Sequence, residues 1–286
     1  MKKKVSILLA ALSMALALGI LLYPAASSAY NSSHQSQICV HHQEQAEKMP
    51  DEQIQKMKQK AKDYNSRLKP IDELQYTADT VGSLSEEYGE QLNMAGDGIM
   101  GYLEIPKIKV KLPIYHGTND ATLELGIGHL MGSALPVGGA GTHCILTAHS
   151  GMASQKMFSD LPQLKEGDTF YLHVLDEVLA YQVDAIHVVL PEDTSYLGAE
   201  RGQDHCTLVT CTPFGVNTHR LLVRGSRVPF TEASEPEADG QEQEKTAGST
   251  WEQEYLKGIL YGIGILLLIL AVCFGIRLWR THHEKA

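Results

Sequence analysis

Three observations predict an all-β fold, a barrel or a sandwich, over residues 98–230. Short apolar segments follow one another from residue 98, separated by Gly, Pro, Asn and Asp. Residues 178–190 alternate apolar and polar side chains around Gln182 and Asp184, as a half-buried strand does. Roughly 130 residues are enough for a hydrophobic core of their own. The predicted strands cover residues 101–105, 110–115, 143–148, 169–175, 178–190, 206–211 and 220–228.

The chain begins with a basic and then an apolar segment. Met1-Lys-Lys-Lys4 precedes residues 5–23, which carry no charge. Small residues at Ser27 and Ala29 fit the spacing that signal peptidase requires. Residues 1–29 are therefore predicted to be a signal sequence or an N-terminal membrane anchor.

Residues 30–97 predict a helical extension, because their apolar side chains are too sparse for a separate core. Apolar residues at helical spacing predict a helix within residues 44–68, and residues 85–92 predict a second, shorter one. We expect these helices to pack on the neighbouring domain. A short helical turn is expected within residues 157–164.

The C-terminal part predicts a tether to a membrane. Residues 231–257 form an acidic linker that cannot bury enough apolar surface to order itself. Residues 258–276 are uncharged and long enough to cross a bilayer, and residues 277–286 form a basic tail. Basic residues on the outer side of both apolar runs place both termini in the cytoplasm if the first run is kept, so the chain between them faces outward.

Composition excludes some classes of partner. The net charge is −10, which argues against nucleic acid, since nucleic-acid binding needs a basic face. Five cysteines are too few for a disulfide framework. A zinc site needs three or four ligands at short spacing, and the pairs His41-His42 and His282-His283 stand alone. Neither a metal nor another cofactor is expected.

Reactive side chains stand where predicted strands end. Cys211 ends the strand 206–211, and Arg220 begins the next strand after a loop that contains Pro213, Gly215 and Asn217. A strand, a short loop and a returning strand bring Cys211 and Arg220 to the same end of a sheet. The fork of an arginine suits a carbonyl oxygen that becomes an oxyanion.

A nucleophilic thiol also needs a proton partner, and His149 is the best placed of the histidines. It follows the apolar segment 143–148 and precedes Gly151. Cys211, His149 and Arg220 together predict a site for acyl transfer. We expect structural roles for His116, His129, His143 and His205, no direct role for His219, and solvated side chains for Arg224 and Arg227.

The residues around this thiol resemble the sortase family. Thr207-Leu-Val-Thr-Cys211 followed by Arg220 is similar to the sortase signature, and the phrase from Thr212 to Gly225 resembles the class C, or pilin-polymerising, branch. The resemblance spans roughly residues 98–228 and implies an eight-stranded barrel. Further matching phrases are Ile105-Pro-Lys-Ile, Leu112-Pro-Ile-Tyr-His-Gly-Thr118, Gly128-His-Leu130 and Leu135-Pro-Val-Gly-Gly139.

The resemblance implies a cysteine transpeptidase at the membrane of a Gram-positive type cell, with its catalytic domain outside. Cys211 would be the nucleophile that forms a thioester, His149 the general acid and base, and Arg220 the group that stabilises the oxyanion or orients the substrate. The implied substrate is a pilin or surface protein with a sorting signal like Leu-Pro-x-Thr-Gly, cleaved between Thr and Gly. The implied acceptor is a pilin lysine.

Three alternatives stay open at this point. The acceptor could be a peptidoglycan amine, so that the enzyme would anchor surface proteins. The protein could be a cysteine protease, in which water resolves the acyl-enzyme. It could also be a non-catalytic scaffold for pilus assembly.

Two details of the family pattern are left open by the sequence. In class C sortases a loop called the lid plugs the active-site groove through an Asp-Pro-aromatic motif. Residues 69–79 lie where this motif would be but contain no Asp followed by Pro. Tyr76 could serve as another anchor for the lid. The family barrel pairs the strands of Cys144 and Cys206 in parallel, so these residues should be neighbours, either bridged or as two buried thiols.

Overall fold

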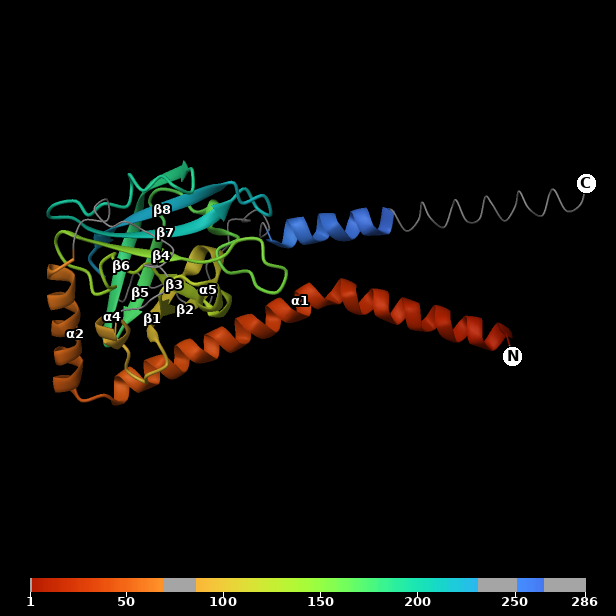
Figure 1. The fold of residues 1–286 in the computed structure, drawn as a ribbon, viewed down its shortest axis with the longest axis horizontal. Coiled ribbons are helices and arrows are strands. Elements are labelled where there is room, and N and C mark those ends of the chain that lie inside the picture. Colours follow the sequence, from red (N-terminus) through yellow and green to blue (C-terminus); the bar gives the residue numbers. More distant parts are fainter. Residues whose placement is uncertain (1, 69–85, 231–250, 265–286) are drawn as a thin grey trace, which may run out of the picture. The chain divides into compact units, whose positions relative to one another are not determined.

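The computed structural model describes residues 2–68, 86–230 and 251–264 (Figure 1). The chain separates into two compact units. One contains residues 23–241, and the other contains residues 1–22 with residues 242–286. Residues 69–79, where the lid motif of class C sortases would lie, are outside the described residues, as are most of the linker and the tail 277–286.

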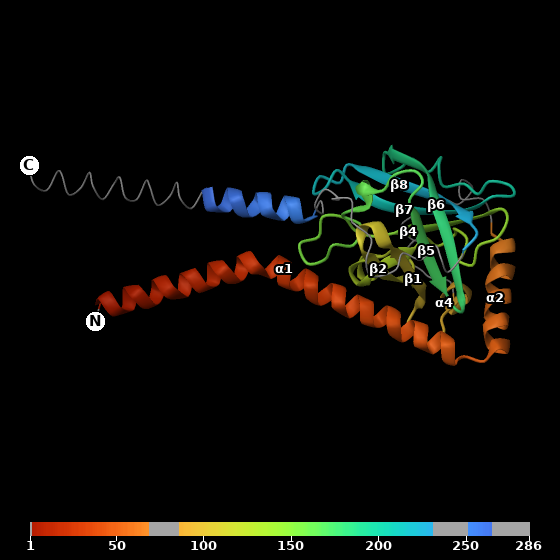
Figure 2. The same ribbon diagram turned by 180° about the vertical axis from the view of Figure 1, so that it is seen from behind.

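Strands close into a single barrel in the order β1-β2-β3-β4-β7-β8-β6-β5 (Figures 1 and 2). The predicted all-β class and the eight-stranded barrel are therefore confirmed. The strands are β1 (Ile99–Ile105), β2 (Val110–His116), β3 (Ile127–His129), β4 (Thr142–Thr147), β5 (Thr169–Val174), β6 (Glu177–Val189), β7 (Asp204–Thr212) and β8 (His219–Val228).

Seven of these strands match the segments predicted from the sequence, and β3 was not predicted. It has three residues, which is too short for alternation to be visible. It pairs parallel with β2 and antiparallel with β4, and so it closes the gap between them. Hydrogen bonds to two neighbours, rather than local sequence preference, make this segment a strand.

The N-terminal extension is helical, and its boundaries differ from the prediction. α1 (Lys2–Lys48) continues through residue 29 without a break, and α2 (Asp51–Ser66) begins after Pro50. The helix predicted within residues 44–68 is confirmed as α2, while residues 44–48 belong to the end of α1. Proline has no amide hydrogen and its ring clashes with the preceding turn, so Pro50 ends one helix and starts the next.

Two shorter helices complete the extension and its surroundings. α4 (Glu86–Glu90) confirms the short helix predicted within residues 85–92, and α5 (Asp120–Leu125) precedes β3. Short 3-10 helices cover Pro106–Ile108 and Leu161–Gln163, so the helical turn predicted within residues 157–164 is confined to its second half.

The extension packs on the barrel as predicted. Ile54 and Ala61 of α2, together with Tyr88 and Leu92, belong to the same hydrophobic cluster as the barrel interior. Lys58 of α2 is almost fully buried and pairs with Asp176 and Glu177 at the turn between β5 and β6. These contacts complete one end of the core with residues that precede the barrel in the chain.

Alternation along the strands decides which side chains face the core. In β7, Cys206 and Leu208 belong to the core cluster, and in β8 Leu221 and Val223 do. Residues of the other parity point to the outer face of the barrel, because successive side chains of a strand alternate between its faces. Cys211 and Arg220 belong to that outer set.

Within the described residues, one helix is long and apolar enough to cross a membrane. It covers Leu12–Lys48 of α1, with a mean hydropathy of 1.6 in its most apolar window. Length and composition alone support this reading, and a signal sequence would share them. The second predicted span, residues 258–276, is described only as far as residue 264, and residues 251–264 are helical.

Candidate active site

Cys211 and Arg220 are direct partners in the antiparallel pairing of β7 with β8. Directly opposed residues of an antiparallel pair project from the same face, with Cβ atoms about 4.5–5.5 Å apart. Both side chains are half-buried. The Arg220 Nη1 atom donates hydrogen bonds to the carbonyl oxygens of Asn217, at 3.4 Å, and His219, at 3.2 Å. The thiol and the guanidinium thus share one open face.

The loop between β7 and β8 reverses the chain direction, so that Arg220 can pair with Cys211. The carbonyl oxygen of Pro213 accepts hydrogen bonds from the amides of Val216 and Asn217, each at 3.0 Å. Gly215, at φ 72°, and Asn217, at φ 63°, both adopt the left-handed conformation that favours these two residue types. The turn residues seen in the sequence therefore set the register of Arg220 against Cys211.

The parallel pairing of β4 with β7 brings His149 level with Cys211 and Arg220. These three residues are called the row below. Thr147 is the partner of Val209, and the pairing continues past the end of β4. The Ala148 amide donates to the Val209 carbonyl at 3.2 Å, and the Thr210 hydroxyl donates to the Ala148 carbonyl at 2.8 Å. Continued by one more residue, this register sets His149 level with Cys211. Since β7 lies between β4 and β8, the three predicted site residues occupy neighbouring strands.

The loops that leave this row touch one another. Gly151, two residues after His149, has φ 78°, and a Cβ atom placed on it would lie 3.2 Å from the amide nitrogen of Gly215. Any side chain at position 151 would push the two loops apart. The His149 carbonyl accepts a hydrogen bond from the Phe158 amide at 3.0 Å, which closes the loop on itself.

Apolar side chains cover the outer face next to the row. Ile145, Val189, Leu197 and Leu222 form a second hydrophobic cluster, and Val189 is the partner of Arg220 in the pairing of β6 with β8. Large apolar side chains around the cluster remain exposed. They are Leu190, Tyr196 and Val216, each between 45% and 64% exposed. A peptide with apolar side chains could be accommodated beside the thiol.

Cys211 differs in exposure from the other cysteines that the structure describes. Cys39, Cys144 and Cys206 are buried, whereas Cys211 is half-buried. Cys144 and Cys206 are direct partners across β4 and β7, as the sequence analysis expected, and both are free thiols, so the bridged alternative is not found. Accessibility singles out Cys211 as the candidate nucleophile among these residues.

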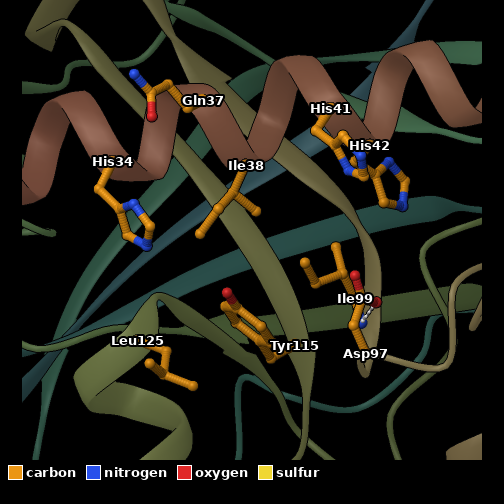
Figure 3. A pocket seen from close by; sticks show the side chains of 9 residues that line it. All are labelled: His34, Gln37, Ile38, His41, His42, Asp97, Ile99, Tyr115 and Leu125. Carbon is orange, nitrogen blue, oxygen red and sulfur yellow. Dashed lines mark hydrogen bonds between the residues drawn. The ribbon is translucent and has the colours of Figure 1, made fainter.

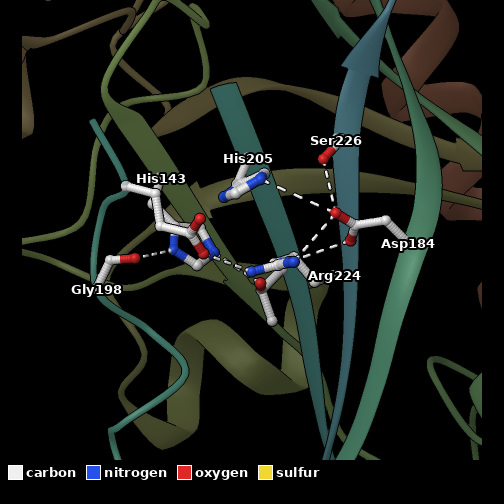
Figure 4. Close-up of polar contacts among 8 residues, drawn as sticks. His143, Asp184, Gly198, His205, Arg224 and Ser226 are labelled. Atoms are coloured by element: carbon white, nitrogen blue, oxygen red, sulfur yellow. Dashed lines mark hydrogen bonds and ion pairs between the residues drawn. The ribbon is translucent and has the colours of Figure 1, made fainter. Parts of the chain in front are cut away.

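A polar cluster around the buried His143 and His205 lies at the opposite end of the same outer face (Figure 4). The Nδ1 of His143 donates to the Gly198 carbonyl at 2.9 Å, and the Thr207 hydroxyl donates to its Nε2 at 2.7 Å. Burial, with the nearby His205 and Arg224, lowers the pKa of His143 to about 4. A structural role for His143 is consistent with these bonds.

Arg224 is not solvated, contrary to expectation. It donates to both carboxylate oxygens of Asp184, at 3.1 and 3.2 Å, and to Glu200 at 2.8 Å (Figure 4). Ser226 also donates to Asp184, at 2.7 Å. The Arg227 side chain is half-buried, and its guanidinium lies 5.6 Å from the ring centre of Tyr181. The two arginines stabilise the barrel wall and the loop before β7.

His129 lies on β3 and is fully buried. Its Nε2 donates to the Ala134 carbonyl at 2.9 Å, and its Nδ1 lies 2.8 Å from the hydroxyl of Tyr88. The nitrogens of His116 lie 2.8 Å from the carbonyl oxygens of Gly98 and Gln91. These bonds to backbone groups fit the structural roles expected for both histidines.

A cavity of about 450 Å³ lies between α1 and the barrel, apart from the row of Cys211 (Figure 3). Polar and apolar side chains of α1, α5, β1 and β2 line it. They are His34, Gln37, Ile38, His41, His42, Asp97, Ile99, Tyr115 and Leu125. Among the described residues, no group of three or more His, Cys, Asp or Glu side chains is arranged to hold a metal ion.

Comparisons with known proteins point to one family. Residues 103–228 match the family model of the sortase domain. The crystal structure of sortase C1 from Streptococcus agalactiae is 43% identical, with a TM-score of 0.62, and the match covers 68% of this chain and 100% of that one. Sortase C-1 from Actinomyces oris is 45% identical, with a TM-score of 0.57, over 63% of this chain and 99% of that one.

A curated relative is more distant. Sortase D of Bacillus subtilis (strain 168) is 31% identical over 131 residues, which is 45% of this chain. The match spans 63% of the length of that relative, less than two thirds of it.

Proposed function

The chain belongs to the sortase family, and from this premise we propose that it is a cysteine transpeptidase of the class C type that joins pilin subunits covalently. The observation that carries the proposal is the row formed by Cys211, Arg220 and His149 on three neighbouring strands. The class C branch is supported by two solved relatives, each more than 40% identical and each named sortase C1 or C-1.

The first half-reaction forms an acyl-enzyme. The Cys211 Sγ, as a thiolate, attacks the carbonyl carbon of the substrate Thr in a Leu-Pro-x-Thr-Gly-like signal, and a C–S bond forms. Arg220 donates hydrogen bonds to the oxyanion. When the intermediate collapses, the Thr–Gly C–N bond breaks and His149 gives a proton to the leaving nitrogen. The product is a thioester between the substrate Thr and Cys211.

The second half-reaction resolves the thioester. A lysine amine of the next pilin attacks the thioester carbonyl and loses a proton to His149, and the C–S bond breaks to return the thiolate. The new bond is an isopeptide. Because a thioester reacts readily with amines, the acyl group can be transferred and not merely hydrolysed.

The surroundings of the row suit this substrate. The exposed side chains of Leu190 and Val216 offer apolar contacts for the Leu and Pro of the signal. The apolar span of α1 would hold the enzyme at the outer face of the membrane. Pilin substrates would be held at the same surface by their own C-terminal membrane anchors. Confinement of both partners to one surface raises their effective concentration.

A labelled Leu-Pro-x-Thr-Gly peptide tests the proposal with the full chain in detergent. We expect a product only when a lysine-bearing pilin peptide is added, and a thioester adduct on Cys211 by mass spectrometry. Amine-independent hydrolysis would indicate a protease, and the absence of any adduct would indicate a scaffold. Preference for a peptidoglycan-derived amine over the lysine would assign the enzyme to surface-protein anchoring.

A further inference from the structure

The loop that follows His149 is fixed at both of its ends. At its start, Ala148 is bonded to β7, and the His149 carbonyl accepts from the Phe158 amide at 3.0 Å. The Gly151 amide donates to the Ser159 hydroxyl at 3.0 Å. Phe158 and Ser159 are buried, so the C-terminal end of the loop is anchored in the protein interior. These bonds fix the backbone of His149 as long as the middle of the loop keeps its shape.

The middle of this loop is bonded to α1, a helix that precedes it by more than a hundred residues. The Asn31 Nδ2 donates to the Ser154 carbonyl at 3.0 Å. The Gln35 Nε2 lies 2.7 Å from the Gln155 Oε1 and 3.7 Å from the Met157 Sδ. Asn31 and Gln35 are four residues apart and therefore lie on one face of the helix. Three successive parts of the loop are thus bonded to one strip of α1.

Gln35 and Gln155 also join the loop to the end of α5. The Gln155 Nε2 donates to the Glu124 carbonyl at 2.7 Å, and the Gln35 Nε2 lies 3.2 Å from the Leu125 carbonyl. The last carbonyl groups of a helix have no partner within the helix and must find one outside it. Gln35 is 7% exposed, so its loss would leave these acceptors without a replacement donor from the protein.

We propose that Asn31 and Gln35 are positioning residues for His149. The two amides hold the 150–157 loop against α1, and through the loop they fix the imidazole relative to Cys211. The inference rests on the proposed role of His149 in proton transfer. Without the amides, the loop would sample more conformations, and a displacement of about 1 Å at a reacting group is enough to lower the rate on the order of 100-fold.

Variants of the full chain in detergent test this role. Gln35→Met keeps the volume of the side chain and removes both donors, and Asn31→Ala removes the second amide. Gln37→Ala, on an exposed position of the same helix, is the matched control. Gln35→Met is expected to lower kcat about 10-fold, to leave KM within twofold, and to shift the pH profile of kcat, because proton transfer is affected and binding is not.

A second measurement does not depend on turnover. The rate at which iodoacetamide alkylates Cys211, followed by mass spectrometry against pH, reports how its neighbours stabilise the thiolate. We expect this profile to shift in Gln35→Met and in the double variant with Asn31→Ala, and to stay unchanged in Gln37→Ala. His149→Ala provides the reference for complete loss of the imidazole.

The outcomes separate the two proposals. An unchanged kcat and an unchanged alkylation profile in Gln35→Met would overturn the positioning role, and so would a lower melting temperature with kcat unchanged. If the wild-type protein transfers no peptide, the proposed function fails, and the alkylation profile still decides the positioning role. Full activity of His149→Ala would overturn both.

Discussion

Arg220 lies directly opposite Cys211 in the antiparallel ladder of β7 and β8. The relationship depends on register, because a slip of one residue would turn Arg220 to the other face of the barrel. Hydrogen bonds of the ladder, and not a flexible loop, therefore set the distance between the thiol and the guanidinium. Such a fixed arrangement suits a group that must meet a charge only in the transition state.

Replacement of Cys211 by Ala should abolish both the thioester adduct and the transfer product. The melting temperature should change by no more than about 2 °C, since the side chain is half-buried and outside the core. Cys206→Ala is the matched control. It removes a fully buried sulfur, so it should cost about 1 kcal/mol of stability and leave the adduct intact. Transfer product from Cys211→Ala would contradict the assignment of the nucleophile.

Arg220→Lys should reduce kcat on the order of 100-fold, although the charge is kept. An ammonium group cannot reproduce the planar fork of donors toward a developing oxyanion. Arg227→Lys, near the other end of β8, should leave kcat unchanged, because either cation can lie over the ring of Tyr181. Steady-state rates with the labelled peptide measure the difference. Equal rates for the two lysine variants would exclude an oxyanion role for Arg220.

Tyr88→Phe should destabilise the protein by about 1–3 kcal/mol in urea denaturation. The hydroxyl of this fully buried residue lies 2.8 Å from the His129 Nδ1 and accepts from the Gly117 amide at 3.1 Å, so its removal leaves buried groups unpaired. Tyr64→Phe, in a half-buried ring that packs on Tyr88, should cost less than about 0.5 kcal/mol. A similar cost for both variants would contradict a stabilising role for the hydrogen bonds of the Tyr88 hydroxyl.

Stability should fall as the pH is lowered from 7 to 5, and His143 should account for about 2 kcal/mol of the fall. Its pKa in the folded protein is about 4, below the ordinary value of 6.5, so the unfolded chain binds the proton first. The stabilisation is present above pH 6.5 and is lost as the pH falls toward 4. Protonation of Nε2 would also remove the acceptor for the Thr207 hydroxyl.

Urea denaturation at several pH values measures this effect. His143→Gln should be less stable than the wild type at pH 7 and should show a smaller loss between pH 7 and pH 5. His187→Gln, at a half-buried histidine on β6, controls for the His→Gln substitution itself. If His143→Gln retains the full pH dependence, the effect arises elsewhere. His205 is one such place, because burial also lowers its pKa.

The sequence by itself determined the all-β class, seven of the strands and the three candidate site residues. Alternation, turn residues and strand-end positions are local signals, and they were enough to name Cys211, His149 and Arg220. The family resemblance supplied the eight-stranded closure. Helical periodicity predicted a helix within residues 44–68, but its start at Asp51, directly after Pro50, is seen only in the structure.

The tertiary structure alone decided which distant residues meet. β3 is a strand because β2 and β4 flank it, and Arg224 is held in ion pairs with Asp184 and Glu200, which come from other parts of the chain. The bond from Gln35 to Gln155 joins residues 120 positions apart. Such contacts depend on how the barrel closes and how residues 23–48 lie along it, and no local pattern of side chains encodes that arrangement.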